Sequence, residues 1–326
     1  MIIVTGAAGF IGANIVATLN ERGRTDILAV DNPDMPAETQ YLHSLKVQHF
    51  LPKAELPAWL EKNAHAVDGI IHMGACSDTT NADRAFMLEN NTKYTRKLWD
   101  FCTHQQKRFV YASSAATYGD GSNGYDDAAD PKQLKPLNIY GESKQLFDLF
   151  ALEQKSTPAG WAGLKFFNVY GPRENHKKRM ASVAFHSFNQ IKQSGKVKLF
   201  KSDRPGIPDG GQQRDFIYVK DCVAAVLHFF NAPKESAAGL YNVGTGQARS
   251  FADLARAVFR ALKLELNIEY IDMPADLKGK YQYFTQATVE KLRGSGFTQP
   301  FHTLEDGVAD YVAWLERNSK HEIRNS

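Results

Sequence analysis

A glycine-rich turn directly after the first apolar run constrains this chain more than any other feature. The sequence opens MIIVTGAAGFIGANIVATL, which places Gly6, Gly9 and Gly12 in a G-x-x-G-x-x-G spacing. Apolar residues then recur every four positions from Ile11 to Leu19, as on one face of a helix. A glycine turn between a strand and a helix lets a pyrophosphate approach the backbone and the helix amino terminus closely. The stretch therefore predicts a dinucleotide-binding strand–turn–helix unit.

Composition limits the class of protein without choosing a function. The chain has 326 residues, 43% hydrophobic and 23% charged, as expected for a globular protein with a sizeable core. Its net charge of +3 is too small to indicate nucleic-acid binding. The charge is compatible with a small anionic substrate in a locally basic cleft.

The cysteines and the amino terminus bear on the cellular compartment. The three cysteines form no C-x-x-C pair, so we expect neither a metal site nor a disulfide framework. The chain shows no basic segment before its first apolar run and no stretch of about 18 apolar residues. These features predict a cytoplasmic protein with no membrane partner.

Residues suited to a cofactor stand where two further buried strands are expected to end. The apolar segment 26–32 ends in Asp31 and Asn32, and an acidic residue at this point holds the adenosine ribose in dinucleotide-binding units. Asp31 taken alone favours NAD, because a carboxylate repels the 2′-phosphate of NADP. The next apolar segment, 67–80, contains small residues such as Gly74 that would let a cofactor lie over the strand end.

A tyrosine and a lysine four residues apart are the first candidates for proton chemistry. Tyr140 and Lys144 lie in a helical pattern over 136–152, which predicts that both side chains share one helix face. A lysine beside a tyrosine favours the phenolate, so we expect a lowered pKa for Tyr140. The preceding apolar strand, 108–119, ends in hydroxyl groups that include Ser114. The glycine turn, the hydroxyl-bearing strand end and this pair together indicate a catalytic site.

These residues resemble the extended short-chain dehydrogenase/reductases that act on nucleotide sugars. The segments FFNVYGPR (166–173), RDFIYVKD (214–221) and YNVGTG (241–246) are also typical of that family. The resemblance implies an α/β fold with a doubly wound parallel (Rossmann) sheet. It implies a dinucleotide-binding domain of residues 1–168 and 214–245 and a smaller α/β substrate domain of residues 169–213 and 246–326.

The resemblance also implies a hydride-transfer reaction. Tyr140 would exchange the proton of the reacting hydroxyl, Ser114 would hydrogen-bond its oxygen, and Lys144 would tune Tyr140 and hold the nicotinamide ribose. Dehydratases of this family usually carry Asp-Glu directly after the catalytic Ser or Thr, whereas this chain has Ala115 and Ala116. A two-step dehydrogenase would need a cysteine nucleophile, and Cys76 is interpreted as a packing residue. Epimerisation is therefore the favoured reaction.

An epimerase that returns hydride to the other face of a ketone needs a second acid or base there. The basic run Lys177-Lys178-Arg179 follows the last expected cofactor strand. Within the family, FFNVYGPRENHKKRMASVAFH, IIHMGACSDTT, YASSAATYG and DLKGKYQYFTQA (276–287) resemble the branch that epimerises ADP-linked heptoses. This resemblance implies that Lys177 is the second base.

The same resemblance implies a substrate and an assembly. ADP-D-glycero-β-D-manno-heptose would be oxidised at C6″ to a ketone and re-reduced by the same NADPH to the L-glycero epimer. The product serves the inner core of lipopolysaccharide. The expected cofactor is one tightly bound NADP per subunit, and the expected assembly is a homopentamer.

Further positions follow from matching residues. Besides the three glycines, the expected cofactor contacts are Phe10, Ile11, Asp31, Asn32, Lys53 at the 2′-phosphate, Met73, Gly74, Ala75, Cys76, Ser77, Asn90, Lys144, Val169 and Lys177. The expected substrate contacts are Asn168, Arg179, His186, Phe200, Lys201, Ser202, Asp203, Arg214 and Tyr281. The forked donors of Arg214 suit a diphosphate.

Three departures from the branch affect affinity rather than reaction type. Glu38 stands where a cofactor-binding lysine is common, so a preference for NADP depends more on Lys53. Arg179 replaces a substrate-contacting serine. The segment 203–213 is longer than usual, and its glycines and prolines predict an irregular flap.

Other interpretations remain at this stage. One is a 4-epimerase or reductase acting on another nucleotide sugar, such as a UDP-hexose. The other is a cofactor-sensing protein without catalysis, although such proteins commonly lose the Tyr–Lys pair that is present here. His72, inside the apolar strand GIIHMGA, is predicted to be a structural hydrogen-bonding residue rather than a catalyst.

Overall fold

The computed structural model describes residues 1–32, 44–233, 238–274 and 282–324. The chain forms two compact units. The first contains Met1–Phe166, Cys222–Val243 and Thr288–Gln299, and the second contains Phe167–Asp221, Gly244–Ala287 and Pro300–Ser326. Two segments fall in other units than the sequence-based division placed them in. Residues 214–221 belong to the second unit because β9 (Gln213–Tyr218) pairs with strands there, and 288–299 returns to the first unit, where α10 (Glu290–Gly294) packs on β10 (Ala238–Val243).

The first unit is built on a parallel sheet of seven strands. Their order across the sheet is β10, β6 (Trp161–Phe166), β5 (Arg108–Ser114), β4 (Gly69–His72), β1 (Ile2–Thr5), β2 (Ile27–Asp31) and β3 (His49–Pro52). The strands read as continuous apolar runs because helices cover both faces of the sheet. The direction of strand order reverses between β1 and β4, where open α/β sheets bind ligands beyond the carboxyl ends of their strands. The expected doubly wound α/β fold is confirmed.

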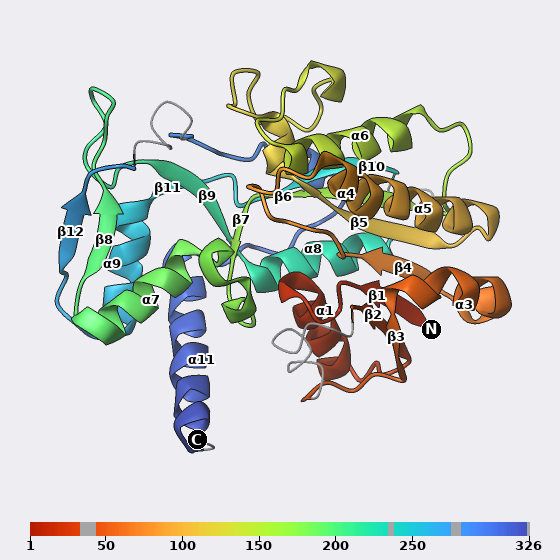
Figure 1. Cartoon of the computed structure of the whole chain (residues 1–326), viewed down its shortest axis with the longest axis horizontal. Helices are drawn as coiled ribbons and strands as arrows, with labels where there is room; N and C mark the ends of the chain where they lie inside the picture. Colours follow the sequence, from red (N-terminus) through yellow and green to blue (C-terminus); the bar gives the residue numbers. More distant parts are fainter. Residues whose placement is uncertain (33–43, 234–237, 275–281, 325–326) are drawn as a thin grey trace. The chain divides into compact units, whose positions relative to one another are not determined.

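Two layers of helices enclose this sheet (Figure 1). On one face, α3 (Leu56–Asn63), α5 (Tyr94–His104) and α6 (Ile139–Glu153) bury their apolar sides in a common core. Trp99 of α5 lies at its centre, with edge contacts to Trp161 at 5.0 Å and to Phe109 at 6.0 Å between ring centres. On the other face lie α1 (Phe10–Glu21) and α8 (Val219–Asn231).

A π-helical turn interrupts the helix that precedes β5. The chain passes from α4 (Arg84–Met87) through η4 (Leu88–Lys93), a π-helix, into α5. Such insertions shift the side chains that follow and often mark functional sites. Here the π-turn carries Asn90 and Asn91.

The second unit is also α/β. Strand β9 lies between β7 (Asn168–Tyr170), which is parallel to it, and β11 (Ala248–Ser250), which is antiparallel. A second pair joins β8 (Val197–Phe200) and β12 (Ile268–Ile271). Its helices are η7 (Asn175–Met180), α7 (Val183–Ser194), α9 (Phe251–Ala261) and α11 (Leu304–Arg324). The remaining short helices, all in the first unit, are η2 (Lys53–Glu55), η3 (Ala64–Ala66), η5 (Ala115–Tyr118) and η6 (Pro131–Gln133).

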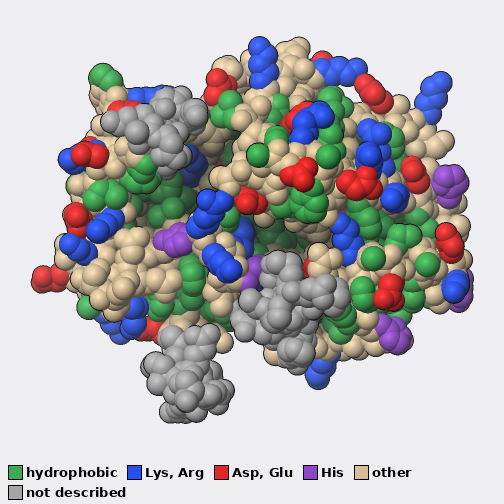
Figure 2. Space-filling model, viewed as in Figure 1, with side chains coloured by type: hydrophobic (Ala, Val, Ile, Leu, Met, Phe, Trp, Pro, Cys, Tyr) green, Lys and Arg blue, Asp and Glu red, His purple; other side chains and the backbone are tan. Residues whose placement is uncertain are grey.

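The surface carries both signs of charge. On the face drawn in Figure 2, Lys and Arg side chains are interspersed with Asp and Glu, in keeping with a net charge of +3. Among the described residues, no helix combines the length and apolar character needed to cross a bilayer.

Candidate functional site

The glycine turn connects β1 to α1 and has no room for side chains. Gly6 has a φ of +64°, and a Cβ there would lie 2.7 Å from the backbone nitrogen of Gly74. A Cβ on Gly12 would lie 1.9 Å from the carbonyl oxygen of Gly6. The first turn of α1 therefore packs directly on the loop, and its N–H groups are presented at the carboxyl edge of the sheet. This backbone cradle fits the pyrophosphate of a dinucleotide.

Asp31, at the end of β2, is tied to the glycine turn. Its carboxylate accepts hydrogen bonds from the N–H groups of Ala8 and Asn32, both at 2.9 Å. Burial raises the pKa of Asp31, and these N–H donors oppose that rise. The carboxylate is thus fixed beside the cradle.

Lys53 brings a cation to the same strand end. Its ammonium donates to the side-chain oxygen of Asn90 and lies 4.4 Å from the ring centre of Tyr94. Burial lowers the pKa of Lys53, while the charge of Asp31 raises it. The structure therefore brings Asp31, Lys53 and Asn90, all predicted cofactor residues, into one cluster.

Asn91 organises the loop that follows β4 and was missed from the sequence. Its side chain accepts from the N–H of Cys76 and donates to the carbonyl of Cys76, both at 2.9 Å, and donates to the hydroxyl of Ser143 at 3.0 Å. The Ser143 hydroxyl in turn donates to the carbonyl of Tyr140 at 2.7 Å. Asn91 thus connects the predicted cofactor loop 73–77 to the helix that carries Tyr140. No local sequence pattern distinguished it from its neighbour Asn90.

His72 is a structural residue, as predicted. Its ring nitrogens lie 2.6 Å from the hydroxyl of Thr5 and 2.9 Å from the hydroxyl of Thr95. Because Thr95 donates to the carbonyl of Asn91 at 2.6 Å, it accepts from Nε2–H of His72. Nδ1 then accepts from Thr5, which itself accepts from the N–H of Gly74. Burial holds the pKa of His72 well below 6.5, so the imidazole is neutral.

Ser114, Tyr140 and Lys144 form the candidate catalytic group of the first unit. Ser114 ends β5, and its hydroxyl oxygen accepts from the N–H of Ala116 at 3.1 Å. Tyr140 lies in the first turn of α6, which begins after the capping side chain of Asn138. The ammonium of Lys144, one turn later, lies 5.9 Å from the centre of the Tyr140 ring. The Ser114 hydroxyl is close enough to Tyr140 to lower the pKa of the phenol.

The titration of this group differs in one respect from the sequence prediction. The pKa of Tyr140 is raised rather than lowered, because burial of the phenol outweighs the lowering effect of Ser114. Burial lowers the pKa of Lys144 to about 8, and its ammonium donates to the carbonyl of Ala112 at 2.8 Å. A protonated phenol beside a serine hydroxyl can donate a proton to a carbonyl oxygen or, in reverse, take one from an alcohol.

The three cations of the basic run have different surroundings in the second unit. Lys177 is half-buried, and burial lowers its pKa while the charge of Glu174 raises it. Lys178 is exposed and has a φ of +50°, a conformation that side chains rarely adopt. Arg179 is exposed. Lys177 is therefore the member of the run that is partly withdrawn from solvent, and its lowered pKa favours proton transfer.

Glu174 supports this turn and was not identified from the sequence. It is fully buried, and its carboxylate accepts from the N–H of Gly171 at 3.2 Å and from the hydroxyl of Ser182 at 2.7 Å. Ser182 is also the N-cap of α7, where it accepts from the N–H of Phe185 at 3.2 Å. A single carboxylate thus joins the start of the turn to the start of the next helix.

The predicted substrate residues lie on several elements of the second unit. Arg214 is buried on β9, with its guanidinium 5.5 Å from the ring centre of Phe251. Asn168, on β7, is exposed and accepts from the hydroxyl of Thr285 at 3.5 Å. His186 on α7 is half-buried. Tyr281 and Glu38 lie outside the described residues.

The segment 203–213 has the irregular conformation expected of a flap up to the start of β9 at Gln213. Asp203 hydrogen-bonds the hydroxyl of Tyr283, and the guanidinium of Arg204 lies 4.1 Å from the centre of the same ring. Lys201 pairs with Asp272 at 3.0 Å, and both side chains are exposed. Tyr283 therefore anchors the flap at Asp203 and Arg204.

Comparisons with known proteins identify the family of this chain. The model of the NAD dependent epimerase/dehydratase family matches residues 2–244. A Fusobacterium nucleatum protein named ADP-L-glycero-D-manno-heptose-6-epimerase is 49% identical over 325 residues, which cover 96% of this chain and 97% of the relative. A protein of the same name from Nitratidesulfovibrio vulgaris is 50% identical over 322 residues, with 96% and 97% covered.

A solved structure gives the same result at the level of the fold. The Helicobacter pylori ADP-L-glycero-D-manno-heptose-6-epimerase matches with a TM-score of 0.82 at 28% identity, over 97% of this chain and 96% of that chain. The match spans both units rather than the dinucleotide-binding sheet alone. From the family model, the relatives and the site, we conclude that this chain belongs to the NAD dependent epimerase/dehydratase family.

Proposed function

We propose that this chain converts ADP-D-glycero-β-D-manno-heptose to its L-glycero epimer at C6″ through a transient ketone. Two relatives named for this activity are 49% and 50% identical over nearly the whole length of the chain. The observation that carries the proposal is the group formed by Ser114, Tyr140 and Lys144 at the carboxyl end of β5. Such a reaction belongs to the synthesis of the lipopolysaccharide inner core.

Tyr140 is the acid/base for the first half of the reaction. Its phenolate oxygen takes the proton of the C6″ hydroxyl, and the Ser114 hydroxyl hydrogen-bonds the same substrate oxygen. Lys144 supports the charge that develops on the phenol. A bound nicotinamide cofactor supplies the hydride acceptor and, later, the hydride donor. In the protein alone the raised pKa of Tyr140 favours the phenol. Forming the phenolate that accepts the substrate proton is therefore the more demanding step for this residue.

Lys177 is the acid/base for the second half. When the ketone presents its other face to the hydride, its oxygen no longer points to Tyr140, so a second proton donor is required. The partial burial of Lys177 lowers its pKa, which brings the ammonium closer to the range in which it can donate and recover a proton. Lys178 and Arg179 are both exposed.

We propose NADP as the cofactor. Lys53 lies in one cluster with Asp31 and Asn90, and its ammonium can attract a 2′-phosphate that Asp31 alone would repel. The test is the mass of the nucleotide released when the purified protein is denatured. Recovery of NADP supports this assignment, and recovery of NAD contradicts it. The variant Lys53→Met should lower the affinity for NADP about tenfold or more relative to NAD.

A direct assay separates this function from its nearest rival. Purified protein is incubated in parallel with ADP-D-glycero-β-D-manno-heptose and with UDP-galactose, and products are resolved by NMR. We expect epimerisation of the ADP-heptose. Turnover of the UDP-sugar alone would instead establish a UDP-hexose 4-epimerase, and no turnover of either with retained cofactor would favour a cofactor-sensing protein.

The proposal extends to location and assembly. The substrate is a nucleotide sugar and the cofactor a nicotinamide nucleotide, which are both used in the cytoplasm, so we place the enzyme there. We further propose a homopentamer, in line with the branch of the family that this chain resembles. Light scattering coupled to size-exclusion chromatography would test it, with a mass of five 36.4 kDa chains as the expected result.

A further inference from the structure

A fully buried ion pair lies beneath the candidate catalytic group. Asp148 of α6 is 0% exposed, Lys165 of β6 is 1% exposed, and their charged atoms are 2.6 Å apart. Removing two charges from water is costly, and their attraction repays the cost only when further hydrogen bonds satisfy both groups. The proposed reaction steps described above use neither residue. The pair therefore calls for a function other than simple stabilisation.

The pair holds the end of β5 and the turn after it. Asp148 accepts from the hydroxyls of Tyr111 at 2.9 Å and Ser113 at 2.7 Å. Lys165 donates to the hydroxyl of Thr117 at 2.8 Å, and Thr117 donates to the carbonyl of Ser114 at 2.8 Å. Each connection ends on Ser114 or on a residue within three positions of it.

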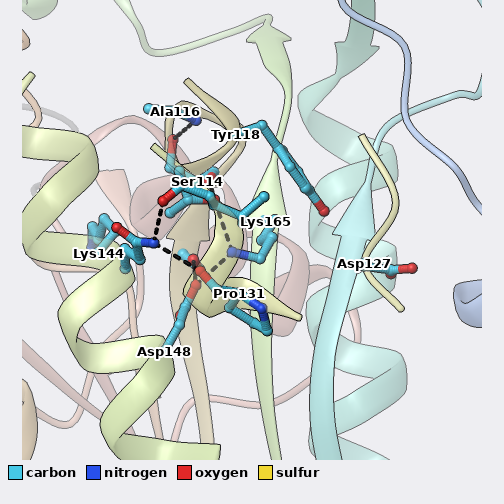
Figure 3. A network of polar contacts seen from close by, with 12 residues as sticks. Ser114, Ala116, Tyr118, Asp127, Pro131, Lys144, Asp148 and Lys165 are labelled. Atoms are coloured by element: carbon cyan, nitrogen blue, oxygen red, sulfur yellow. Dashed lines mark hydrogen bonds and ion pairs between the residues drawn. The ribbon is translucent and has the colours of Figure 1, made fainter. Parts of the chain in front are cut away.

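The pair also faces Lys144. Lys144 and Asp148 are four residues apart on α6, so their side chains lie on one face of the helix. Figure 3 shows Lys144 on one side of Asp148 and Lys165 on the other. The charge of Asp148 raises the pKa of Lys144, against the larger lowering effect of burial. Asp148 thus pairs directly with Lys165, and its charge also acts on the second buried cation, Lys144.

The other ionisable groups around Lys144 are accounted for. Tyr111 of β5 and Tyr118 of η5 are buried phenols whose raised pKa values keep them neutral. His72 of β4 is a neutral imidazole. The charged groups on the outer side of α6 form two exposed pairs, Arg84–Glu142 and Lys132–Glu153. Among the described residues, Asp148 is thus the charged group that acts on Lys144 from within the core, and Lys165 is its buried partner.

We infer that Asp148 and Lys165 are positioning residues for the proposed reaction: their buried pair holds Ser114 and the end of β5 in place and sets the charge around Lys144. The inference rests on the proposed roles of Ser114, Tyr140 and Lys144. The inference predicts the direction in which each substitution shifts the protonation of Lys144. Loss of the carboxylate should favour neutral Lys144, and loss of Lys165 should favour charged Lys144.

The test is the titration of Lys144 followed by NMR of lysine labelled with ¹³C at Cε, with the signal assigned by its absence in Lys144→Arg. We expect a wild-type midpoint at about 8. Asp148→Asn should lower the midpoint, and Lys165→Met should raise it, each by about one pH unit or more. In the double variant the midpoint should return towards the wild-type value. In Lys165→Arg, which keeps the positive charge, the midpoint should equal the wild-type value.

Matched controls keep the result interpretable. Glu142→Gln removes a carboxylate from the same helix where it pairs with exposed Arg84, and it should leave the midpoint unchanged. If Asp148→Asn does not fold, as judged by circular dichroism, the upward shift in Lys165→Met and its absence in Lys165→Arg decide the question. Equal midpoints in every folded variant would overturn the inference.

The titration requires neither substrate nor turnover, so it separates this inference from the proposed function. If the wild-type protein fails to epimerise the ADP-heptose but Asp148→Asn and Lys165→Met shift the Lys144 midpoint in opposite directions, the proposed function is refuted. The influence of the buried pair on Lys144 is then retained. An active wild-type protein with unmoved midpoints would retain the function and refute the control. In active variants, the pH profile of kcat should move in the same direction as the midpoint.

Discussion

The buried carboxylate of Glu174 accepts hydrogen bonds from both the N–H and the hydroxyl of Ser182, at 2.5 and 2.7 Å. The segment between them contains Lys177, whose N–H donates to the carbonyl of Glu174 at 2.9 Å. Glu174 thus fixes both ends of the turn and supplies the negative charge that raises the pKa of Lys177. One residue controls the position and the protonation of the proposed second base.

Replacing Glu174 with Gln should lower kcat by about 10- to 100-fold, because a small displacement of an acid/base residue is costly. Since Glu174 raises the pKa of Lys177, its loss should also move the alkaline limb of the kcat profile to lower pH. The measurement is kcat against pH. Glu316→Gln, an exposed carboxylate paired with Lys192 in the same unit, is the control. An unchanged alkaline limb in an active Glu174→Gln variant would contradict this role.

Substitutions of neighbouring lysines in the basic run should have very different effects on epimerisation. Tyr140→Phe and Lys177→Met should each reduce epimerisation by about 100- to 10,000-fold, since each removes an acid/base group. Lys178→Met should have a mild effect because that side chain is exposed. The assay is conversion of the D-glycero to the L-glycero epimer at saturating substrate. Near-normal turnover in Lys177→Met would refute the two-base assignment.

The backbone conformation at Lys178 should lower the stability of the fold. A non-glycine residue at a φ of +50° and a ψ of −122° is strained. Lys178→Gly should therefore raise the free energy of unfolding by about 1 kcal/mol. Lys178→Ala removes the same charge but keeps the strain, so it should show no gain. Denaturant unfolding of both variants is the measurement, and equal stabilisation by Ala and Gly would attribute the gain to charge rather than backbone.

Acid should destabilise the fold through two histidines whose pKa values burial lowers, the buried His72 and the half-buried His176. The folded-state pKa of His72 lies well below 6.5 and that of His176 is about 4, so below pH 6.5 the unfolded chain binds protons that the folded chain does not. The free energy of unfolding should therefore fall as pH drops from 6.5 towards 4, by up to about 1.4 kcal/mol per pH unit for each histidine. Equilibrium denaturation at several pH values measures this slope.

A variant assigns part of that slope to one residue. His72→Gln keeps a donor for Thr95 but binds no proton. It should therefore reduce the slope of the free energy of unfolding against pH by up to the contribution of one histidine, about 1.4 kcal/mol per pH unit. His65→Gln changes an exposed histidine and serves as the control. A slope in His72→Gln equal to that of wild type would show that His72 does not remain neutral in the folded state.

The glycine turn and the Tyr140–Lys144 pair could be predicted from the sequence, because backbone geometry requires particular residues at a fixed spacing. Gly6 and Gly12 leave room for the close approach of two backbone segments, which no other residue permits. Tyr140 and Lys144 share a helix face through a spacing of four. These features depend on neighbours in the chain, so local pattern was sufficient to predict them.

Other parts depend on contacts between distant segments. Asp148 and Lys165 are 17 residues apart, on a helix and a strand, and their pairing follows from the packing of α6 on the sheet. Asn91 acquires its contacts through a π-turn that residue composition did not indicate. The raised pKa of Tyr140 likewise reflects burial, which the sequence-based prediction underestimated.

The most direct test of the account follows the hydrogen at C6″. ADP-D-glycero-β-D-manno-heptose carrying deuterium at C6″ is converted by the purified protein in ordinary water, and unlabelled substrate is converted in deuterium oxide. Oxidation to a ketone and return of the same hydride predict that the L-glycero product keeps the deuterium in the first experiment and acquires none in the second. Loss of the label to solvent, or its uptake from solvent at C6″, would contradict the proposed transfer.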